Sequence, residues 1–130
     1  MSAPVITLPP YAEALGIRVV EWRDGVPVVA IDYDEGSRGN PGMLHGGVIG
    51  GLLEVAALAA LDARRADPAV PALKPLSSTI QYLRVAGEGR TFAMAEIVRT
   101  GRRLGNLHVE AWQDDPSRPV AVAQVVVAAT

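Results

Sequence analysis

The strongest pattern in the sequence is a long apolar stretch in the middle of the chain. From Val48 to Leu61 every residue is apolar or glycine except Glu54. A helix that is apolar on all sides is typical of a buried helix, so we expect a central helix from Val48 to about Arg65. An ionised carboxylate rarely lies inside such a helix without a partner or a purpose. Glu54 is therefore a candidate functional residue.

The segment before this helix reads NPGMLHGG over residues 40–47. Its proline and glycines predict a tight turn, close backbone approach and an uncapped helix N-terminus. Such a terminus presents free N–H groups and a partial positive charge. This arrangement suits a developing oxyanion, and the N–H of Gly46 is placed to supply it.

The other apolar positions predict a short helix and six strands. Pro10 and Gly16 bracket a helix of one to two turns. Asp24-Gly25 is a hairpin signal, and Pro27 is expected just ahead of the strand that follows. The expected strands are Ile17–Arg23, Val28–Tyr33, Leu76–Arg84, Arg90–Thr100, Leu104–Gln113 and Pro119–Ala128.

A hairpin, one long buried helix and then a meander of four strands indicate an α+β fold. Residues 1–9 are expected to form a flexible N-terminal arm, and residues 10–130 a single domain. Six strands cover only part of a buried helix, and a second copy of the subunit is the simplest candidate to cover the rest.

Two of the strands show which side chains face the core. Even spacing makes Phe92, Met94 and Val98 available for the core face of their strand. In the next strand, Leu107 and its alternate neighbours Val109 and Ala111 are apolar, whereas His108 falls on the polar face.

The composition narrows the chemistry. Apolar residues make up 49% of the chain and charged residues 20%, with a net charge of −2 and no basic run of the kind that binds nucleic acid. The absence of cysteine excludes thiol catalysis and Cys-ligated zinc, and two histidines are too few for a typical catalytic metal centre. The apolar run is too short for a membrane span, and no signal peptide is recognisable. We expect a cytoplasmic protein without a metal or redox cofactor.

Leu44-His45-Gly46-Gly47, with an acid nine positions after the histidine, resembles the hotdog-fold acyl-CoA thioesterases. The most similar branch is the phenylacetate-degradation type of the 4-hydroxybenzoyl-CoA thioesterase superfamily. Further along, IQYLR at 80–84 and VRTGR at 98–102 resemble this family's third strand and its Gly-basic turn. The resemblance covers roughly residues 10–130.

The resemblance implies a hotdog fold, in which a curved antiparallel sheet of about six strands wraps the helix and subunits form dimers and dimers of dimers. It also implies that the Gly46 amide polarises the thioester carbonyl and that Glu54 is the general base or nucleophile. The family's polar residue before the histidine falls on Gly39, and Asn40 takes its place if one residue is deleted. In that case Asn40 would help to position water or the thioester.

The resemblance and the chemistry of the residues together give a set of further candidates. His45 would position the thioester or orient its own loop. Residues suited to binding substrate, including the phosphates of coenzyme A, are Gly47, Arg84, Gly101, Arg102 and Arg103. Each arginine is also compatible with a simple solvated surface position.

Spacing adds one inference that does not depend on the family. Gly46 and Glu54 are eight residues apart, which in a helix is about 12 Å at roughly 1.5 Å per residue. One carbonyl group cannot contact both within one chain, so a shared site needs two antiparallel helices from different subunits.

The sequence thus favours an acyl-CoA thioesterase with composite sites in a homodimer. Two alternatives remain open: a hotdog enoyl-CoA hydratase or dehydratase in which His45 works with the acid, and a non-catalytic module that binds acyl-CoA. We expect neither a nucleic acid nor a membrane as a binding partner.

Overall fold

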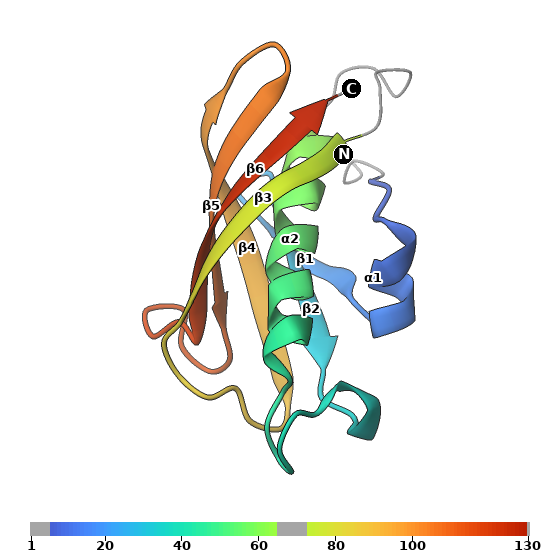
Figure 1. The fold of residues 1–130 in the computed structure, drawn as a ribbon. Helices are drawn as coiled ribbons and strands as arrows, with labels where there is room; N and C mark the ends of the chain where they lie inside the picture. The colour runs from blue at the N-terminus through green and yellow to red at the C-terminus, as the bar shows by residue number, and fades with distance from the viewer. Residues whose placement is uncertain (1–5, 65–72, 130) are drawn as a thin grey trace.

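The computed structural model describes residues 6–64 and 73–129. These residues form one long helix lying in the concave face of a curved antiparallel sheet, with a second, short helix beside it (Figure 1). The predicted α+β hotdog arrangement is confirmed. The elements are α1 (Pro10–Leu15), β1 (Arg18–Arg23), β2 (Val26–Asp32), a 3-10 helix (Glu35–Ser37), α2 (Gly46–Ala63), β3 (Leu73–Tyr82), β4 (Arg90–Thr100), β5 (Leu104–Trp112) and β6 (Ala121–Ala129).

The central helix α2 begins at Gly46, two residues earlier than expected, and ends at Ala63. The expected end at about Arg65 lies outside the described residues. Length and hydropathy would suit a membrane span, but half of the helix is buried inside the molecule, as in the core helix of a globular fold. Its buried residues are Ile49, Leu52, Leu53 and Val55–Ala60.

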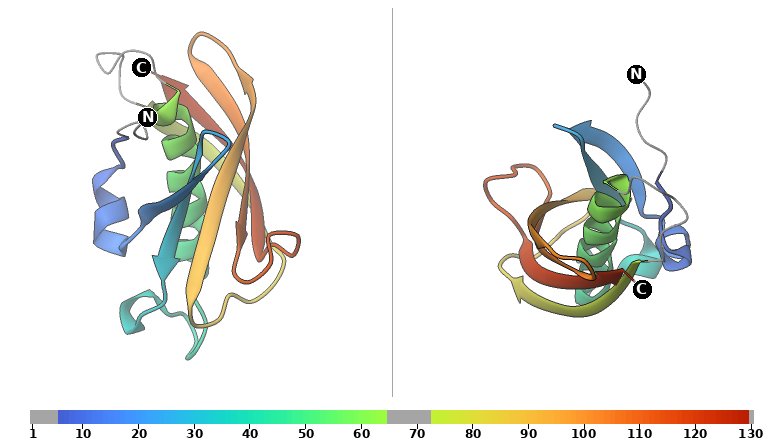
Figure 2. Two further views of the ribbon diagram at one scale, coloured as in Figure 1. Left: turned by 180° about the vertical axis from the view of Figure 1, so that it is seen from behind. Right: turned by 90° about the horizontal axis from the view of Figure 1, so that it is seen from above.

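The strand order in the sheet is β1-β2-β4-β5-β6-β3, with every neighbouring pair antiparallel. The expected four-strand meander is therefore wrong, because β3 pairs with β6 and not with β4. The reason is the long helix between β2 and β3. It carries the chain across the concave face, so that β3 joins the opposite edge of the sheet (Figure 2).

The core face of β4 also differs from the prediction. Ala93 and Ala95 are buried in the main core against α2, so Phe92 and Met94 point to the other face of the strand. There Phe92 stacks on Trp112 with ring centroids 5.8 Å apart. Large side chains were expected on the face of β4 toward α2. The helix lies so close to the sheet that this face has room for alanine and not for larger residues. On β5 the predicted inward residues are buried as expected.

Two prolines lie inside strands rather than ahead of them. Pro27 belongs to β2, opposite Trp22 of β1. It is tolerated because β4 pairs with β2 only from Val29 onward, so no β4 carbonyl requires the missing N–H. Pro75 lies in the edge strand β3, next to a register shift between Pro75 and Ser77.

The N-terminal segment covers part of α2 on the side that the sheet leaves open. The Thr7 N–H donates to Oδ2 of Asp62 at 2.9 Å, and Ile6 and Leu8 pack against the core. Further along, Ala12 of α1 is fully buried. The chain's own residues therefore cover some of the surface that we expected a second copy to cover.

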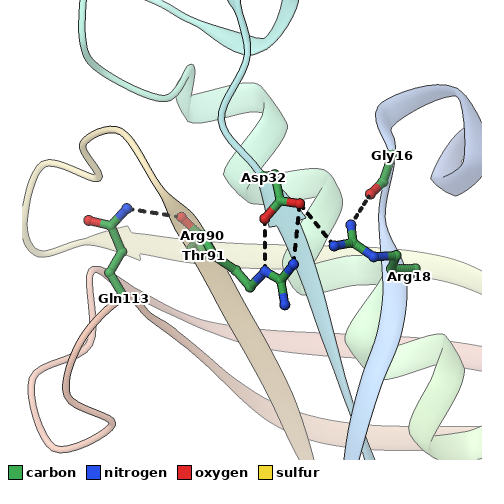
Figure 3. Close-up of polar contacts among 6 residues, drawn as sticks. All are labelled: Gly16, Arg18, Asp32, Arg90, Thr91 and Gln113. Atoms are coloured by element: carbon green, nitrogen blue, oxygen red, sulfur yellow. Dashed lines mark hydrogen bonds and ion pairs between the residues drawn. The ribbon is translucent and has the colours of Figure 1, made fainter.

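An ion-pair cluster joins three strands near the end of α1 (Figure 3). Asp32 on β2 accepts from Arg18 on β1 at 2.9 Å and from Nε of Arg90 on β4 at 2.8 Å. Arg18 also donates to the carbonyl of Gly16, which caps α1, at 3.4 Å. The hydrogen bonds from Arg90 and then Arg18 lower the pKa of Asp32 to about 2.

This cluster predicts a pH-dependent contribution to stability. Because the pKa of Asp32 is lowered, its contribution is present above its ordinary value near 3.8 and is lost as the pH falls through about 2. We expect Asp32→Asn to lower Tm at pH 7 by about 1–3 °C, a small effect because the pair is exposed to solvent.

Thermal unfolding followed by circular dichroism between pH 7 and pH 2 measures this. The difference between Asp32→Asn and wild type should disappear toward pH 2, whereas Asp114→Asn, on an exposed loop, should show no such trend. A Tm difference that stays constant with pH would contradict the assignment.

Candidate functional site

The N-terminus of α2 is capped, contrary to the prediction of an uncapped end. Nδ1 of His45 accepts from the Gly47 N–H at 2.9 Å, and the His45 carbonyl accepts from Val48 and Ile49. Because Nδ1 accepts this hydrogen bond, the ring proton lies on Nε2. Among the residues that the structure describes, the N–H of Gly46 has no acceptor. The cap therefore satisfies Gly47 and leaves the Gly46 donor available.

Tyr82 on β3 closes one side of this helix end. Its hydroxyl donates to the Gly46 carbonyl at 2.8 Å, and its ring lies 3.6 Å from where a Cβ on Gly46 would be. One turn later, a Cβ on Gly50 would lie 3.1 Å from Cδ1 of Ile80. Glycine at position 50 thus allows β3 to approach α2 closely, which fixes the helix end against the sheet edge.

The loop before α2 places Gly39 beside the histidine. A Cβ on Gly39 would lie 3.4 Å from Cα of His45. Asn40 is exposed in a turn in which its carbonyl accepts from the Met43 N–H at 2.9 Å. The position of the family's polar residue therefore carries no side chain here, and the role predicted for Asn40 stays a prediction.

Glu54 lies at mid-length of α2 and is only half-buried within a single chain. Its Oε1 accepts from the Tyr11 hydroxyl of α1 at 2.8 Å. Among the described residues, the partner of this carboxylate is thus a phenol, and neither an arginine nor a backbone amide contacts it. Gly46 and Glu54 both belong to α2, so the helical spacing of about 12 Å stands.

The candidate arginines occupy opposite ends of the fold. Arg84 follows β3 closely, at the end where Tyr82 meets Gly46, and its N–H donates to the Val120 carbonyl at 3.1 Å. Gly101, Arg102 and Arg103 form the β4–β5 turn and line a small cavity with Leu61, near the C-terminal end of α2. One chain does not bring this turn close to its own Gly46.

A separate polar group lies on the outer face of the sheet. His108 contacts Oε2 of Glu110 at 2.9 Å and the side-chain amide of Gln124 at 2.8 Å, which agrees with its predicted polar-face position. Within the described residues, no three His, Cys, Asp or Glu side chains gather in a metal-binding arrangement. The absence of a cofactor stays a prediction.

These features define a class of protein. An antiparallel sheet wraps a helix that carries a free amide at its first residue and an acid at mid-length, which is the arrangement implied for hotdog thioesterases. The family model described as the acyl-CoA thioesterase N-terminal domain matches residues 35–128. The chain belongs to this family.

Solved structures agree with this assignment. A protein from Chromobacterium violaceum is 34% identical, with a TM-score of 0.74, covering 93% of this chain and 83% of that one. A variant of the phenylacetic acid degradation protein PaaI from Thermus thermophilus is 28% identical, with a TM-score of 0.77, covering 94% of this chain and 100% of that one.

The PaaI protein from the phenylacetic acid degradation operon of E. coli shares the fold, at 22% identity and a TM-score of 0.78, covering 94% of this chain and 85% of that one. The predicted resemblance to the phenylacetate-degradation branch is confirmed. No curated protein matches the sequence.

Sequence reasoning missed two tyrosines that contact the candidate residues. Tyr82 lies within the IQYLR segment that carried the resemblance, and its position on the strand could have marked it. Tyr11 had no such signal, since only the docking of α1 on α2 brings it to Glu54.

The capping geometry of His45 gives a prediction about stability. His45→Ala removes the acceptor for the Gly47 N–H and should lower the free energy of unfolding by about 0.5–2 kcal/mol, whereas His45→Asn should keep most of it because asparagine is a good N-cap. Urea denaturation of the two variants beside wild type measures this. Equal losses in both variants would show that the cap contributes nothing.

Proposed function

We propose that this chain hydrolyses acyl-CoA thioesters to a free acid and coenzyme A, with Gly46 and Glu54 as its catalytic groups. Membership of the acyl-CoA thioesterase family supports the reaction in general. The observation that carries the assignment of residues is the pair on α2: an N–H at Gly46 with no acceptor in the described residues, and a carboxylate at Glu54 with one oxygen engaged.

The chemistry needs a polarised carbonyl, an activated attacking group and a leaving thiolate. The Gly46 N–H and the positive end of α2 stabilise the negative charge that develops on the thioester oxygen. As general base, Glu54 takes a proton from water, the hydroxide adds to the carbonyl carbon, and the carbon–sulfur bond breaks to release the thiolate, which gains a proton. As nucleophile, Glu54 attacks the carbonyl carbon and expels the thiolate, which gains a proton, and water then hydrolyses the resulting acyl anhydride. Both routes need the same carboxylate.

The separation of about 12 Å between the two groups in one chain supports a site shared by two subunits. The contact between the subunits would run along β3, because it is a ten-residue edge strand with a single neighbour, β6, in the described sheet. An edge of this length presents unpaired backbone groups that a second copy can satisfy. Exposed Leu76 and Tyr82 add apolar surface along it.

A two-fold arrangement also gives the arginines a common role. If the two α2 helices run antiparallel, the β4–β5 turn of one chain, with Arg102 and Arg103, lies toward the Gly46 end of the other. Arg84 is already at that end. The phosphates of coenzyme A would then meet arginines from both subunits, while Gly47 and Gly101 allow the backbone to approach the substrate.

The hydratase alternative has less support from the site. Nδ1 of His45 is occupied by the helix cap, so only Nε2 remains for proton transfer. A purely binding role would leave Glu54 without a function. We propose a cytoplasmic, cofactor-free enzyme in which coenzyme A is part of the substrate.

Glu54→Gln should reduce turnover by about 100-fold or more, because it keeps the shape of the side chain and removes the basic oxygen. The measurement is thiol release from a panel of acyl-CoA thioesters, run beside enoyl-CoA hydration and plain acyl-CoA binding. Glu88→Gln, at an exposed turn, is the control. Turnover within a few-fold of wild type in Glu54→Gln would rule out the assignment, and hydration without hydrolysis would favour the alternative enzyme.

Mixing two inactive variants tests whether the site is shared. Gly46→Pro removes the proposed oxyanion donor, and it should fold because Gly46 is the first residue of α2 and His45 has extended backbone angles (φ −63°, ψ 136°) that suit a residue before proline. After exchange with Glu54→Gln, about half of the dimers are heterodimers with one intact site, so roughly a quarter of wild-type activity should return.

Each variant incubated alone, through the same exchange protocol, is the control. A mixture that remains inactive, although native mass spectrometry shows heterodimers, would place the site within one subunit.

A further inference from the structure

We infer that Tyr11 is a positioning residue for Glu54, and that the short helix α1 is therefore part of the active site. This inference rests on the proposed function, because it assigns Tyr11 a role through the carboxylate that performs the chemistry. It concerns a residue that lies outside the segment matched by the family model, residues 35–128.

The contact divides the two oxygens of the carboxylate. The Tyr11 hydroxyl donates to Oε1 of Glu54 at 2.8 Å, and within the described residues Oε2 has no protein partner. One oxygen is thus held while the other stays available to act as base or nucleophile. Glutamate has several rotatable bonds, so a fixed donor on Oε1 removes conformations that point Oε2 away from the thioester.

The donor itself is fixed by the way α1 is built and docked. Pro10 begins the helix, and Gly16 ends it in the left-handed conformation at φ 78°. Ala12 is fully buried, and Leu15 lies 3.3 Å from where a Cβ on Gly51 of α2 would be. Residues 7, 11 and 15 therefore meet α2 at positions 62, 54 and 51, so α1 runs antiparallel to α2 (Figure 1).

The far end of α1 is also tied to the sheet. Arg18 reaches the Gly16 carbonyl while it pairs with Asp32 (Figure 3). At 3.4 Å this hydrogen bond is long and therefore weak, so it orients the end of α1 more than it stabilises it. Together with the apolar contacts, it places the Tyr11 ring over the middle of α2.

Tyr11 keeps its proton throughout the physiological range. Partial burial, then the hydrogen bond to Glu54 and the negative charge of that carboxylate, raise the pKa of Tyr11 well above its usual value. The phenol is therefore a donor and not an acid in the reaction.

Tyr11→Phe keeps the ring and removes only the hydroxyl. We expect kcat to fall about tenfold, the size associated with losing one hydrogen bond to a charged group, and KM to change little. The loss should depend on Glu54, so that the same substitution made in Glu54→Gln changes kcat little. A tyrosine with a merely structural role would lower kcat in both backgrounds.

Three comparisons sharpen the test. Glu13→Gln, exposed on the same helix, should leave kcat unchanged. Leu15→Ala loosens the docking of α1 and should lower kcat as Tyr11→Phe does. Tyr11→Phe added to Glu54→Gln should cause no further loss of kcat, because Tyr11 acts only through the carboxylate.

A readout that does not use activity is the absorbance of ionised tyrosine during an alkaline titration. Glu54→Gln should lower the pH at which one of the three tyrosines ionises, since the negative charge beside Tyr11 is gone. Thermal unfolding shows that each variant is folded at the assay temperature.

The outcomes separate this inference from the proposed function. If wild type hydrolyses thioesters and Glu54→Gln does not, but Tyr11→Phe matches wild type in kcat, the inference is wrong and the proposed function stands. A loss in kcat that is equally large when Tyr11→Phe is added to Glu54→Gln would also overturn it, in favour of a structural role. If wild type hydrolyses no acyl-CoA, the proposed function fails and this inference fails with it.

Discussion

Close packing between α2 and the concave face of the sheet is the contact on which the rest of the fold depends. Both surfaces include small residues among larger apolar ones. Ala56, Ala57 and Ala59 of α2 are fully buried, as are Ala93 of β4 and Ala111 of β5. Small side chains on both sides let the helix axis lie near the sheet and leave it few alternative positions, since larger residues would force the two apart. The position of α2 in turn determines where its first amide and the carboxylate of Glu54 lie.

The topology of the sheet follows from this helix. A helix of 18 residues is about 27 Å long at roughly 1.5 Å per residue, so the chain that leaves β2 returns to the sheet far from where it left. As a result β3 occupies an edge beside β6, and β2 pairs with β4. The edge position of β3 has two consequences. It places Tyr82 against the Gly46 carbonyl, and it leaves one side of a long strand open to another chain.

The local elements could be predicted from the sequence because they depend on local patterns. The apolar run identified α2 within two residues of its start, and Asp24-Gly25 forms the expected hairpin turn with positive φ at both residues. The sheet order could not be predicted, because it depends on the path of the helix and not on the pattern within any strand. The inward face of β4 was misassigned for a related reason: large apolar residues suggest a core, but the space beside α2 admits alanine.

The residues of the candidate site also differ in whether the sequence alone could predict them. Glu54 and Gly46 were recognised because an acid in an apolar helix and glycines ahead of it are visible in the sequence. His45 is different, because its capping hydrogen bond depends on the ring's orientation. Tyr11 depends on tertiary structure alone, since 43 residues separate it from the carboxylate that it contacts.

The proposed catalytic residues and the residue that positions the acid lie in different parts of the chain. The residues that would carry out hydrolysis lie within the segment 35–128 that matches the family, where the wrapped helix holds them in place. The residue that holds the acid lies before this segment, on α1. Since α1 is only six residues long, it cannot be stable by itself and forms only because Ala12 and its neighbours dock on α2. The docking of α1 on α2 therefore keeps this helix folded and also orients Glu54. Whatever loosens that docking also frees the carboxylate.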